Sequence, residues 1–439
     1  MADVKKWLSG RNLRWAGLGA LILIEVIIFL TMRFWIAKLA VGGVALVVAL
    51  AVYALATTRK RWLKWVSASG LGLLAVAVIG GSIFVSTQMT HHTMSAPPAL
   101  ITPSGDPVLD SIRRGIEYLK VHQEPDGEFS AGMLDPKPAF TAMVVDALAR
   151  SPDRYDESHP FMKKAVDAIL SHQKDYGGIY SLGFGNYVTS VSVMALNRMD
   201  NPDHKDALVR AQEYVQSCQR DSGGMGYGPS SRADLSNTAL ALEALNEMGL
   251  PKEDETFKRA ISFITRCQND NEQNTEEWAT ADGGFIYHPG NSPAGEYEQD
   301  GKKRFTSYGL MSYAGLVSFL WAGVDRDDPR VQSAFRWVSD NWTLEENKNR
   351  GGVGLYYYYL TMAKALQVYG QRIIKSADGL EHDWPVELAE KVMSLQKENG
   401  SWVNAERRYL ETDSILVTAY MVRTLSICHE VIGAEKSED

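Results

Sequence analysis

One helix ending returns along this chain of 439 residues about every 50 residues. Its fullest copy, LAEKVMSLQKENGSW, carries a glutamine, a glycine and a tryptophan at Gln396, Gly400 and Trp402. Each copy is followed by a second, more apolar helix, and a period of this length is typical of stacked helical hairpins. Further copies end at Gln123, Gln173, Gln219 and Gln268, and a degenerate one at Trp342.

The two helices of a hairpin differ in polarity. The first carries charge on one face, as at Arg113, Glu117 and Lys120, whereas the second, as over residues 238–245, is nearly free of charge. Because helices that are apolar all round are buried, we expect the first helices to form an outer ring and the second an inner one. The chain is predicted to be all-α, with about six hairpins closed into an α/α toroid around a cavity. The glutamines and the aromatic residues after them recur in every repeat, which favours a structural role.

The repeats resemble those of the terpenoid cyclases and protein prenyltransferase β subunits, which carry this Q-x-x-x-G-x-W element (the QW motif). The resemblance covers about residues 106–432. DLSNTA, FTSYGLMSYAGLVSF, GLYYYYLTMAKAL and TDSILVTAY are more narrowly similar to bacterial prenyltransferase and squalene oxidase repeat proteins. The resemblance implies a squalene-cyclase-like toroid and leaves the reaction open.

The N-terminal quarter of the chain is predicted to span a membrane. Residues 15–32 contain one charge, Glu25, and residues 39–58 and 65–90 contain none, so each is long enough to cross a bilayer. Eight basic residues lie either before the first span or between the second and third spans. Only Arg33 and Lys38 lie between the first and second spans. This bias predicts a cytoplasmic N-terminus. We expect three transmembrane helices in residues 1–91, a linker at 92–107 and a periplasmic or otherwise extracytoplasmic toroid at 108–434.

Composition narrows the partners. The net charge is −8 and no basic stripe is present, so nucleic acid is not an expected partner. The expected partners are the lipid bilayer and a lipid or isoprenoid ligand. Cys218 and Cys267, with His122 and His172, occupy one repeat position in successive hairpins, about 10 Å apart, too far for shared zinc ligation. No cysteine follows an aspartate by two residues, as in the prenyltransferase zinc site, and we expect neither a metal nor a cofactor.

The resemblance to class II terpene cyclases can be tested at one motif. Those enzymes protonate an alkene with the third residue of D-x-D-D-T-A, an aspartic acid kept neutral by its surroundings. Here the match is DLSNTA: Asp234 fits the first position, but Ser236 replaces the proton donor and Asn237 its neighbour. A serine hydroxyl is too weak an acid for this step, so catalysis stays open. Asp327 and Asp328 do not complete a D-D-x-x-D cluster and are interpreted as helix-start residues.

We expect the cavity to be lined from the starts of the inner helices. Asp234 and Asp413 are the candidate catalytic acids, with N-capping as the alternative for both. The aromatic residues suit a greasy or cationic guest, with inner-ring packing as the alternative. The candidate cavity residues are Ser236, Asn237, Tyr308, Tyr313, Tyr356, Tyr357, Glu411 and His288. A long insertion over residues 269–304 is expected to form a lid or rim, contacting ligand through Trp278, Tyr287 and His288.

Three functions remain open from the sequence. The first is an enzyme, cyclase-like or prenyltransferase-like, acting on an isoprenoid or another membrane lipid. The second is a non-catalytic binding module that holds a lipid, a peptide or a partner protein. The third is a carbohydrate-active α/α toroid, which needs two carboxylates about 5 to 10 Å apart. Only Asp234, Glu411 and Asp413 are candidates for such a pair.

Overall fold

The computed structural model describes residues 102–129, 136–181 and 183–435. The chain divides between Ser95 and Ala96 into two units, and every described residue lies in the second. The three predicted transmembrane helices lie outside the described residues. Among the described helices, α16 (Ser414–Glu435) contains a stretch that is long and apolar enough to span a bilayer, but 78% of its apolar window is buried and it packs against neighbouring helices of the toroid.

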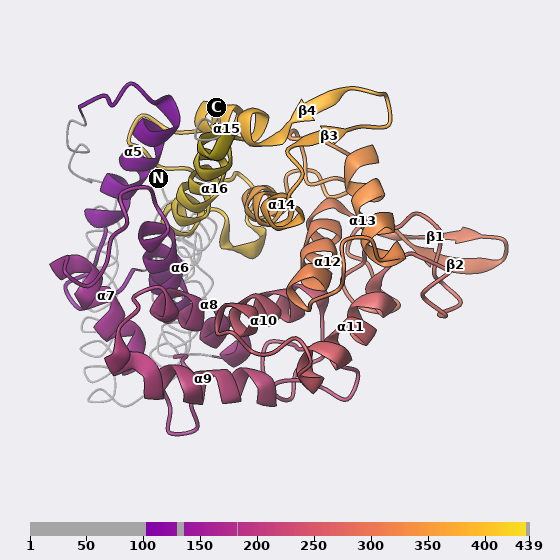
Figure 1. Cartoon of the computed structure of the whole chain (residues 1–439), viewed down its shortest axis with the longest axis horizontal. Helices are drawn as coiled ribbons and strands as arrows, with labels where there is room; N and C mark the ends of the chain where they lie inside the picture. The colour runs from indigo at the N-terminus through magenta and orange to yellow at the C-terminus, as the bar shows by residue number, and fades with distance from the viewer. Residues whose placement is uncertain (1–101, 130–135, 182, 436–439) are drawn as a thin grey trace, which may run out of the picture. The chain divides into compact units, whose positions relative to one another are not determined.

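Six helical hairpins in the described region form two concentric rings (Figure 1). Each inner helix contacts the next inner helix, and α16 contacts α6, so the inner ring is closed. The predicted α/α toroid is therefore observed. The outer helices are α5 (Pro107–Lys120), α7 (Pro160–Ser171), α9 (Lys205–Ser217), α11 (Glu255–Cys267), α13 (Pro329–Asp340) and α15 (Trp384–Ser394). The inner helices are α6 (Lys137–Ala149), α8 (Gly185–Asn197), α10 (Leu235–Glu247), α12 (Gly309–Trp321), α14 (Leu355–Tyr369) and α16.

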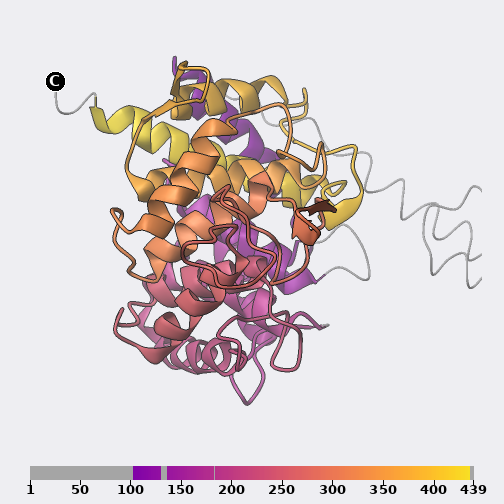
Figure 2. The same cartoon turned by 90° about the vertical axis from the view of Figure 1, so that its right-hand side faces the viewer.

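Helix polarity decides which ring each helix joins. In α11 the buried residues Phe257, Phe263 and Ile264 fall on one face, while α12 is buried almost all round. Outer helices start at ordinary signals: Asp106 caps α5 and Asp328 caps α13, each followed by a proline in the first turn. The interpretation of Asp328 as a helix-start residue is confirmed. Seen from the side, α16 ends at one face of the ring (Figure 2).

The recurring glutamines tie neighbouring repeats together. In each of five copies the side-chain Nε2 donates to the carbonyl of the turn glycine in its own repeat and to a carbonyl in the first turn of the next outer helix, at 2.8 to 3.2 Å. The last of them, Gln396, reaches Ser111 in α5 and so closes the outer ring. The structural interpretation of the glutamine is confirmed. The acceptors in the next helix are Phe161, Ala207, Thr256, Arg330 and Ser111.

The turn glycines are required by the same close approach. Gly223 has a φ of +88°, and a Cβ there would collide with the carbonyl oxygen of Arg259 in the next outer helix. Gly127, Gly177, Gly283 and Gly400 repeat both features. Only glycine fits where the backbone is left-handed and another backbone lies this near.

A hydroxyl on five of the six described inner helices completes the tie. Thr238 Oγ1 accepts from the N–H of Met225, just after the glycine turn, and donates to the carbonyl of Asp234. Equivalent hydroxyls accept from the N–H of Phe129, Ile179, Phe285 and Trp402; they belong to Thr141, Thr189, Ser312 and Thr418. The threonine of DLSNTA is therefore a repeat-wide structural feature.

The degenerate fifth hairpin is held differently. It lacks the glutamine, and the turn after α13 is held by α14: Tyr358 Oη donates to Thr343 O at 2.8 Å and Tyr359 Oη to Leu344 O at 2.5 Å. Trp342 stacks on His382 with ring centroids 5.1 Å apart. Two of the four consecutive tyrosines in α14, Tyr358 and Tyr359, therefore take the place of the missing glutamine.

The prediction of an all-α fold needs a small correction, because the described region also holds two antiparallel hairpins and two 3-10 turns. Strand β1 (Glu296–Gln299) pairs with β2 (Lys302–Phe305), and β3 (Ile373–Lys375) with β4 (Glu381–Asp383). The short helices are η1 (Pro202–His204) and η2 (Arg408–Leu410). The β1–β2 hairpin belongs to the long insertion and projects outward from the ring (Figure 1).

Candidate ligand cavity

The main described cavity, of about 220 Å³, opens at the N-terminal ends of the inner helices. All six inner helices, or the residues just before them, contribute to its wall. The inner helices therefore start at one face of the toroid, and their starts converge on one space. The lining residues are Pro136, Phe140, Phe184, Tyr187, Tyr227, Ser236, Asn237, Tyr287, Tyr308, Leu310, Met311, Tyr357, Tyr409, Leu410, Leu416 and Tyr420.

Exposed apolar side chains gather at the mouth of this cavity. Phe184, Tyr227, Tyr409 and Leu410 are each between 38% and 50% exposed, and all four line it. Phe184 and Tyr227 pack edge to face, with centroids 4.9 Å apart. Phe184, Tyr409 and Leu410 also have positive φ, an uncommon conformation for large side chains, and such strain concentrates at functional sites. The mouth is therefore an apolar rim held by an unusual backbone.

The inner wall is aromatic and uncharged. Tyr308 and Tyr420 are buried, and Tyr357 packs against Tyr420 with centroids 5.6 Å apart. Burial raises the pKa of Tyr357 to about 12 and raises those of Tyr287, Tyr308 and Tyr420 above the ordinary value. These phenols stay neutral at physiological pH. The lining set contains no Asp, Glu, Lys, Arg or His.

Asn237, a lining residue of this cavity, carries an unpaired acceptor. Its Nδ2 donates to Asp234 Oδ2 at 2.8 Å, which fixes the orientation of the amide. Its Oδ1 has no hydrogen-bond partner, although the residue is only 2% exposed and lines the cavity. A buried acceptor left unpaired costs about 1 to 3 kcal/mol, so this atom marks where a ligand donor, or water, would bind.

Asp234 lies behind the wall. Its Oδ1 accepts from the N–H of Asn237 at 2.8 Å and caps α10, and its Oδ2 is held by the Asn237 amide. Burial raises its pKa to about 6, and hydrogen bonds from Asn237 and Tyr287 oppose that rise. The carboxyl therefore supports Asn237 and Tyr287, and it is not among the lining residues.

The two acids before α16 also act structurally. Asp413 Oδ1 accepts from the N–H groups of Ile415 and Leu416, at 2.8 and 3.1 Å, and so caps α16. Glu411 is fully buried and accepts from the N–H of Tyr357 in the first turn of α14 at 2.8 Å. Burial raises the pKa of Glu411 to about 7. Neither carboxyl lines the cavity, and both hold helix starts.

The other predicted cavity residues divide. Ser236, Asn237, Tyr308 and Tyr357 line the cavity, as does Tyr287 from the insertion.

Three predicted cavity residues lie elsewhere, and their placement is corrected. Tyr313 is buried against Tyr358, with centroids 5.6 Å apart, and Tyr356 packs edge-on against Tyr359. His288 is buried in its loop, where its Nδ1 lies 3.4 Å from Pro289 O. A helical run of tyrosines points in several directions, so only one of four consecutive residues reaches the cavity.

Trp278 in the insertion does not reach the cavity either. It packs edge-on against Phe305, with ring centroids 5.7 Å apart. The insertion thus contributes Tyr287 to the rim of the cavity. The described lining includes no residue of the β1–β2 hairpin.

Sequence reasoning missed six of the nine described aromatic lining residues. Phe140 and Tyr187 lie in the first turns of α6 and α8 and Tyr420 in the second turn of α16, where a repeat-by-repeat alignment of the inner helices would have found them. Tyr227 and Tyr409 lie in loops, and nothing in their local sequence marks them. The three cysteines are free and buried.

One acidic group in the described region, Glu124, Asp126 and Glu128, could hold a cation. Lys137 Nζ instead lies 3.0 Å from a Glu124 oxygen and 2.9 Å from a Glu128 oxygen. Glu128 also accepts from His172. One ammonium group is therefore already paired with these acids.

Solved structures similar in fold share little sequence with this chain. The type II terpene cyclase MstE from Scytonema is 14% identical over 73% of this chain and 98% of its own, with a TM-score of 0.46. A protein from Actinoplanes is 15% identical over 73% of this chain and 98% of its own, with a TM-score of 0.45. An α-1,6-mannanase from a Salegentibacter species is 12% identical over 74% and 99%, with a TM-score of 0.49.

Family comparisons cover most of the toroid. None of the curated proteins matches the sequence significantly. The squalene-hopene cyclase C-terminal domain matches residues 129–288, and the prenyltransferase α-α toroid domain matches residues 237–435. The resemblance carried by the repeat is thereby confirmed: residues 129–435 are similar to squalene-hopene cyclase and prenyltransferase toroid domains.

Proposed function

We propose that this toroid binds a neutral, largely apolar ligand carrying one hydrogen-bond donor, of which a short isoprenoid alcohol is the simplest example. The observation that carries the proposal is the unpaired, buried Oδ1 of Asn237, a residue in the wall of the aromatic cavity. A site built to hydrogen-bond a hydroxyl discriminates strongly against ligands that lack it. The apolar rim at Phe184, Tyr409 and Leu410 supports an apolar body for the ligand.

Charge argues against a diphosphate in this cavity. Diphosphate recognition uses Lys, Arg or a metal ion, and the described lining residues include none of the charged types.

Volume argues against a long polyprene. The cavity of about 220 Å³ is smaller than the roughly 300 to 1,000 Å³ of most small-molecule sites. A few isoprene units fit better than a squalene chain.

Cyclisation by alkene protonation is not part of the proposal. Ser236 faces the cavity where the family's acid would stand, and Asp234 has both carboxyl oxygens engaged by Asn237. Incubation of the full-length protein with squalene should give no cyclic triterpene by gas chromatography. A cyclic product that disappears in Asp234→Asn would make Asp234 the acid and overturn this assignment.

We also propose that three N-terminal transmembrane helices anchor the toroid outside the cytoplasm. The eight-to-two distribution of basic residues supports this orientation. A reporter fused after Asp439 should be active only when exported, and one placed after Lys60 only in the cytoplasm. Cytoplasmic activity at the C-terminus would reverse the assignment.

The binding test uses matched ligands. Full-length protein in detergent is titrated with farnesol and with farnesyl methyl ether, which keeps the apolar body but lacks the donor, and binding is followed by native mass spectrometry. Farnesol should bind about tenfold more tightly. Asn237→Ala should abolish the preference, and Ser236→Trp should block both ligands by filling the cavity. Ser262→Trp, on the exposed face of α11, is the control. Equal binding of both ligands by the wild-type protein would contradict the donor assignment.

A carbohydrate-active toroid is the second candidate, because aromatic walls also bind sugars. Glycoside hydrolysis needs two carboxylates facing the substrate, and no carboxylate is among the lining residues that the structure describes. The geometry therefore favours binding over sugar hydrolysis. Binding of a partner protein to the apolar rim would appear as co-purification that farnesol does not displace.

A further inference from the structure

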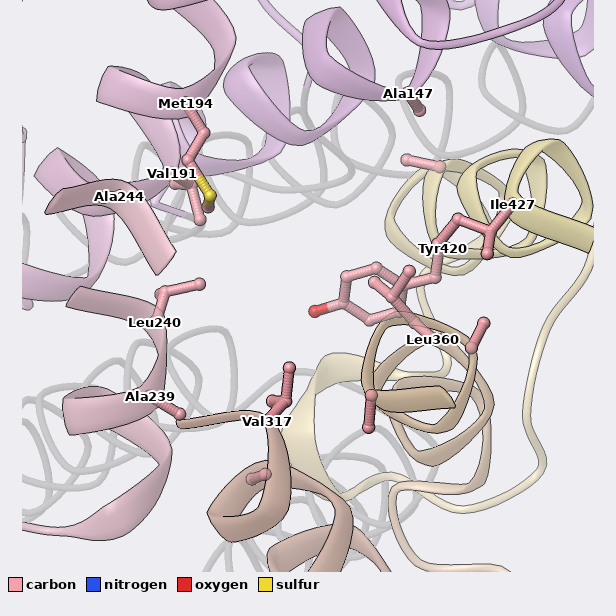
Figure 3. Packing of buried hydrophobic residues seen from close by; sticks show 14 of the residues in the cluster. Ala147, Val191, Met194, Ala239, Leu240, Ala244, Val317, Leu360, Tyr420 and Ile427 are labelled. Carbon is pink, nitrogen blue, oxygen red and sulfur yellow. The ribbon is translucent and has the colours of Figure 1, made fainter. Parts of the chain in front are cut away.

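A second, smaller cavity of about 40 Å³ lies further along the inner helices. It shares Tyr187, Tyr357 and Tyr420 with the aromatic cavity, so these three tyrosines form the layer between the two spaces. Figure 3 shows Val191, Met194, Leu240, Leu360 and Tyr420 pointing toward this region from four inner helices. Unlike the first cavity, this one is lined by charged residues: Asp146, Lys364 and Arg423.

The charged residues belong to a buried cluster of ion pairs. Arg150 contacts both Asp146 and Glu247, and Lys364 Nζ lies 2.8 Å from a Glu243 oxygen. Arg198 Nη2 lies 3.5 Å from Glu247. Each of the three carboxylates thus already has a close cationic partner.

Arg423 is the poorly paired member. Its Nε is 3.8 Å from Asp146 Oδ2, beyond hydrogen-bond distance, and this buried atom has no partner. Three cations of the cluster are largely buried, Arg150, Lys364 and Arg423, against three carboxylates; Arg150 and Lys364 make the close contacts, so Arg423 is left without one. Burial, and then the charge of Arg150, lower the pKa of Arg423 to about 10, so it remains charged at physiological pH.

The helix dipoles do not complete this pairing. Asp146 and Glu247 lie in the last turns of α6 and α10, where the negative ends of the dipoles favour cations. The dipole does not supply a hydrogen-bond acceptor to Arg423 Nε, however, and the space beside the guanidinium is not filled by protein. A buried guanidinium that lacks an acceptor beside an unfilled space is suited to a small anion.

We infer that this second cavity is a carboxylate site, with Arg423 as its main recognition group and Lys364 beside it. A guanidinium group binds a carboxylate through two parallel hydrogen bonds. The volume accommodates a carboxylate group or about one water molecule more readily than a phosphate with its ester. The side chains of Lys364 and Arg423 keep 15% and 11% exposure, which leaves a route from solvent.

Two sources could supply this carboxylate: a free small acid, or the end of an amphipathic molecule whose apolar part passes the tyrosine layer. The experiment titrates full-length protein in detergent with acetate, hexanoate and farnesoic acid by isothermal calorimetry. Acetamide and hexanamide, which have the same shapes without the charge, are the controls. The carboxylates should bind and the amides should not. Affinity that rises with chain length assigns an amphipathic ligand, whereas similar affinity for all three assigns a free acid.

The variants test the residue itself. Arg423→Gln should weaken acetate binding at least about tenfold, and Arg423→Lys should retain part of it. Arg198→Gln, at a half-exposed cation outside the lining, should leave it unchanged. Wild-type protein that binds no carboxylate, or Arg423→Gln protein that binds acetate as well as the wild type, would overturn the inference. Loss of folding in Arg423→Gln leaves the wild-type comparison of acids with amides as the deciding result.

Farnesol binding reports on the first cavity separately. It should persist in Arg423→Gln, so failure of the alcohol proposal and failure of the carboxylate proposal give different results.

Discussion

The turns between repeats and the starts of the inner helices belong to the same hairpins, but the turns are alike from repeat to repeat and the helix starts are not. In the turns one arrangement recurs: a glutamine side chain, a left-handed glycine and an inner-helix hydroxyl meet in nearly every repeat. At the inner-helix starts no two repeats agree. The position four residues before the tie hydroxyl is Lys137, Gly185, Asp234 or Tyr308. What recurs holds the ring together, and what varies shapes the cavity.

This comparison reassigns part of the cyclase-like motif. Thr238 belongs to the recurring tie, and Asp234, Ser236 and Asn237 belong to the variable part. Similarity at the threonine therefore reflects the fold, and only the variable positions bear on chemistry.

The largest effect is expected from the recurring part. Trp402→Ala removes a fully buried ring whose Nε1 donates to Val392 O at 2.8 Å, and should reduce the free energy of unfolding by about 3 to 5 kcal/mol. Chemical denaturation measures it. Trp278→Ala, at a partly exposed ring outside the ties, is the control and should cost clearly less. If the two variants lost similar amounts of stability, the distinction between residues of the repeat ties and residues of the insertion would not hold.

The buried acids at the variable inner-helix starts should make the stability of the protein depend on pH. Burial raises the pKa of Asp234 to about 6 and of Glu411 to about 7 in the folded protein, above their ordinary values. The folded state then binds more protons than the unfolded state between about pH 4 and 7, so stability falls as pH rises through this window. Each group contributes roughly 3 kcal/mol to the fall.

Urea denaturation at a series of pH values tests this expectation. Asp234→Asn and Glu411→Gln should each flatten the curve. A wild-type stability that rises between pH 4 and 7, with the two variants following it, would show that these acids do not control the dependence.

A single tie should matter less than a core ring. Gln396→Ala removes the hydrogen bond from its Nε2 to Ser111 O of α5, across the closure, and the one to Gly400 O in its own turn, and should cost about 1 to 3 kcal/mol and lower the melting temperature. Gln367→Ala, an exposed glutamine on α14 bonded to Glu430, is the matched control. If Gln396→Ala left stability unchanged and abolished farnesol binding, the glutamine would belong to the site.

The smallest effect is expected at Tyr313. Its hydroxyl is buried without a hydrogen-bond partner, and the side chain does not line the cavity. Tyr313→Phe should change stability by less than about 1 kcal/mol, and toward greater stability, because the unpaired hydroxyl is removed. Farnesol affinity should not change. A loss of affinity in melting-curve titrations would place Tyr313 in the site after all.

Local pattern made much of the fold predictable. The repeat period, the polarity difference between paired helices and the glutamine at each helix end indicate six hairpins and a closed ring, and these are observed. The helix-capping alternative for Asp234 and Asp413 was also visible, since both precede apolar helices. The small strands escaped prediction because they lie in insertions, where no repeat constrains the chain.

The candidate site was predictable only in part, because it depends on the direction in which each side chain points as well as on the order of residues in the sequence. Tyr356, Tyr357, Tyr358 and Tyr359 are alike in sequence, yet the helix turns one toward the cavity and two toward the turn after α13.

Sequence by itself determined the ring, since hydrophobic period and turn chemistry are local properties repeated along the chain. The tertiary structure alone decided that Asp234 holds the Asn237 amide, that Asn237 Oδ1 is buried without a partner, and that Arg423 Nε lacks an acceptor. Those facts depend on burial and on contacts between residues distant in sequence, such as Arg423 and Asp146. Burial sets what an unpaired polar atom costs, and only closure of the ring creates that burial.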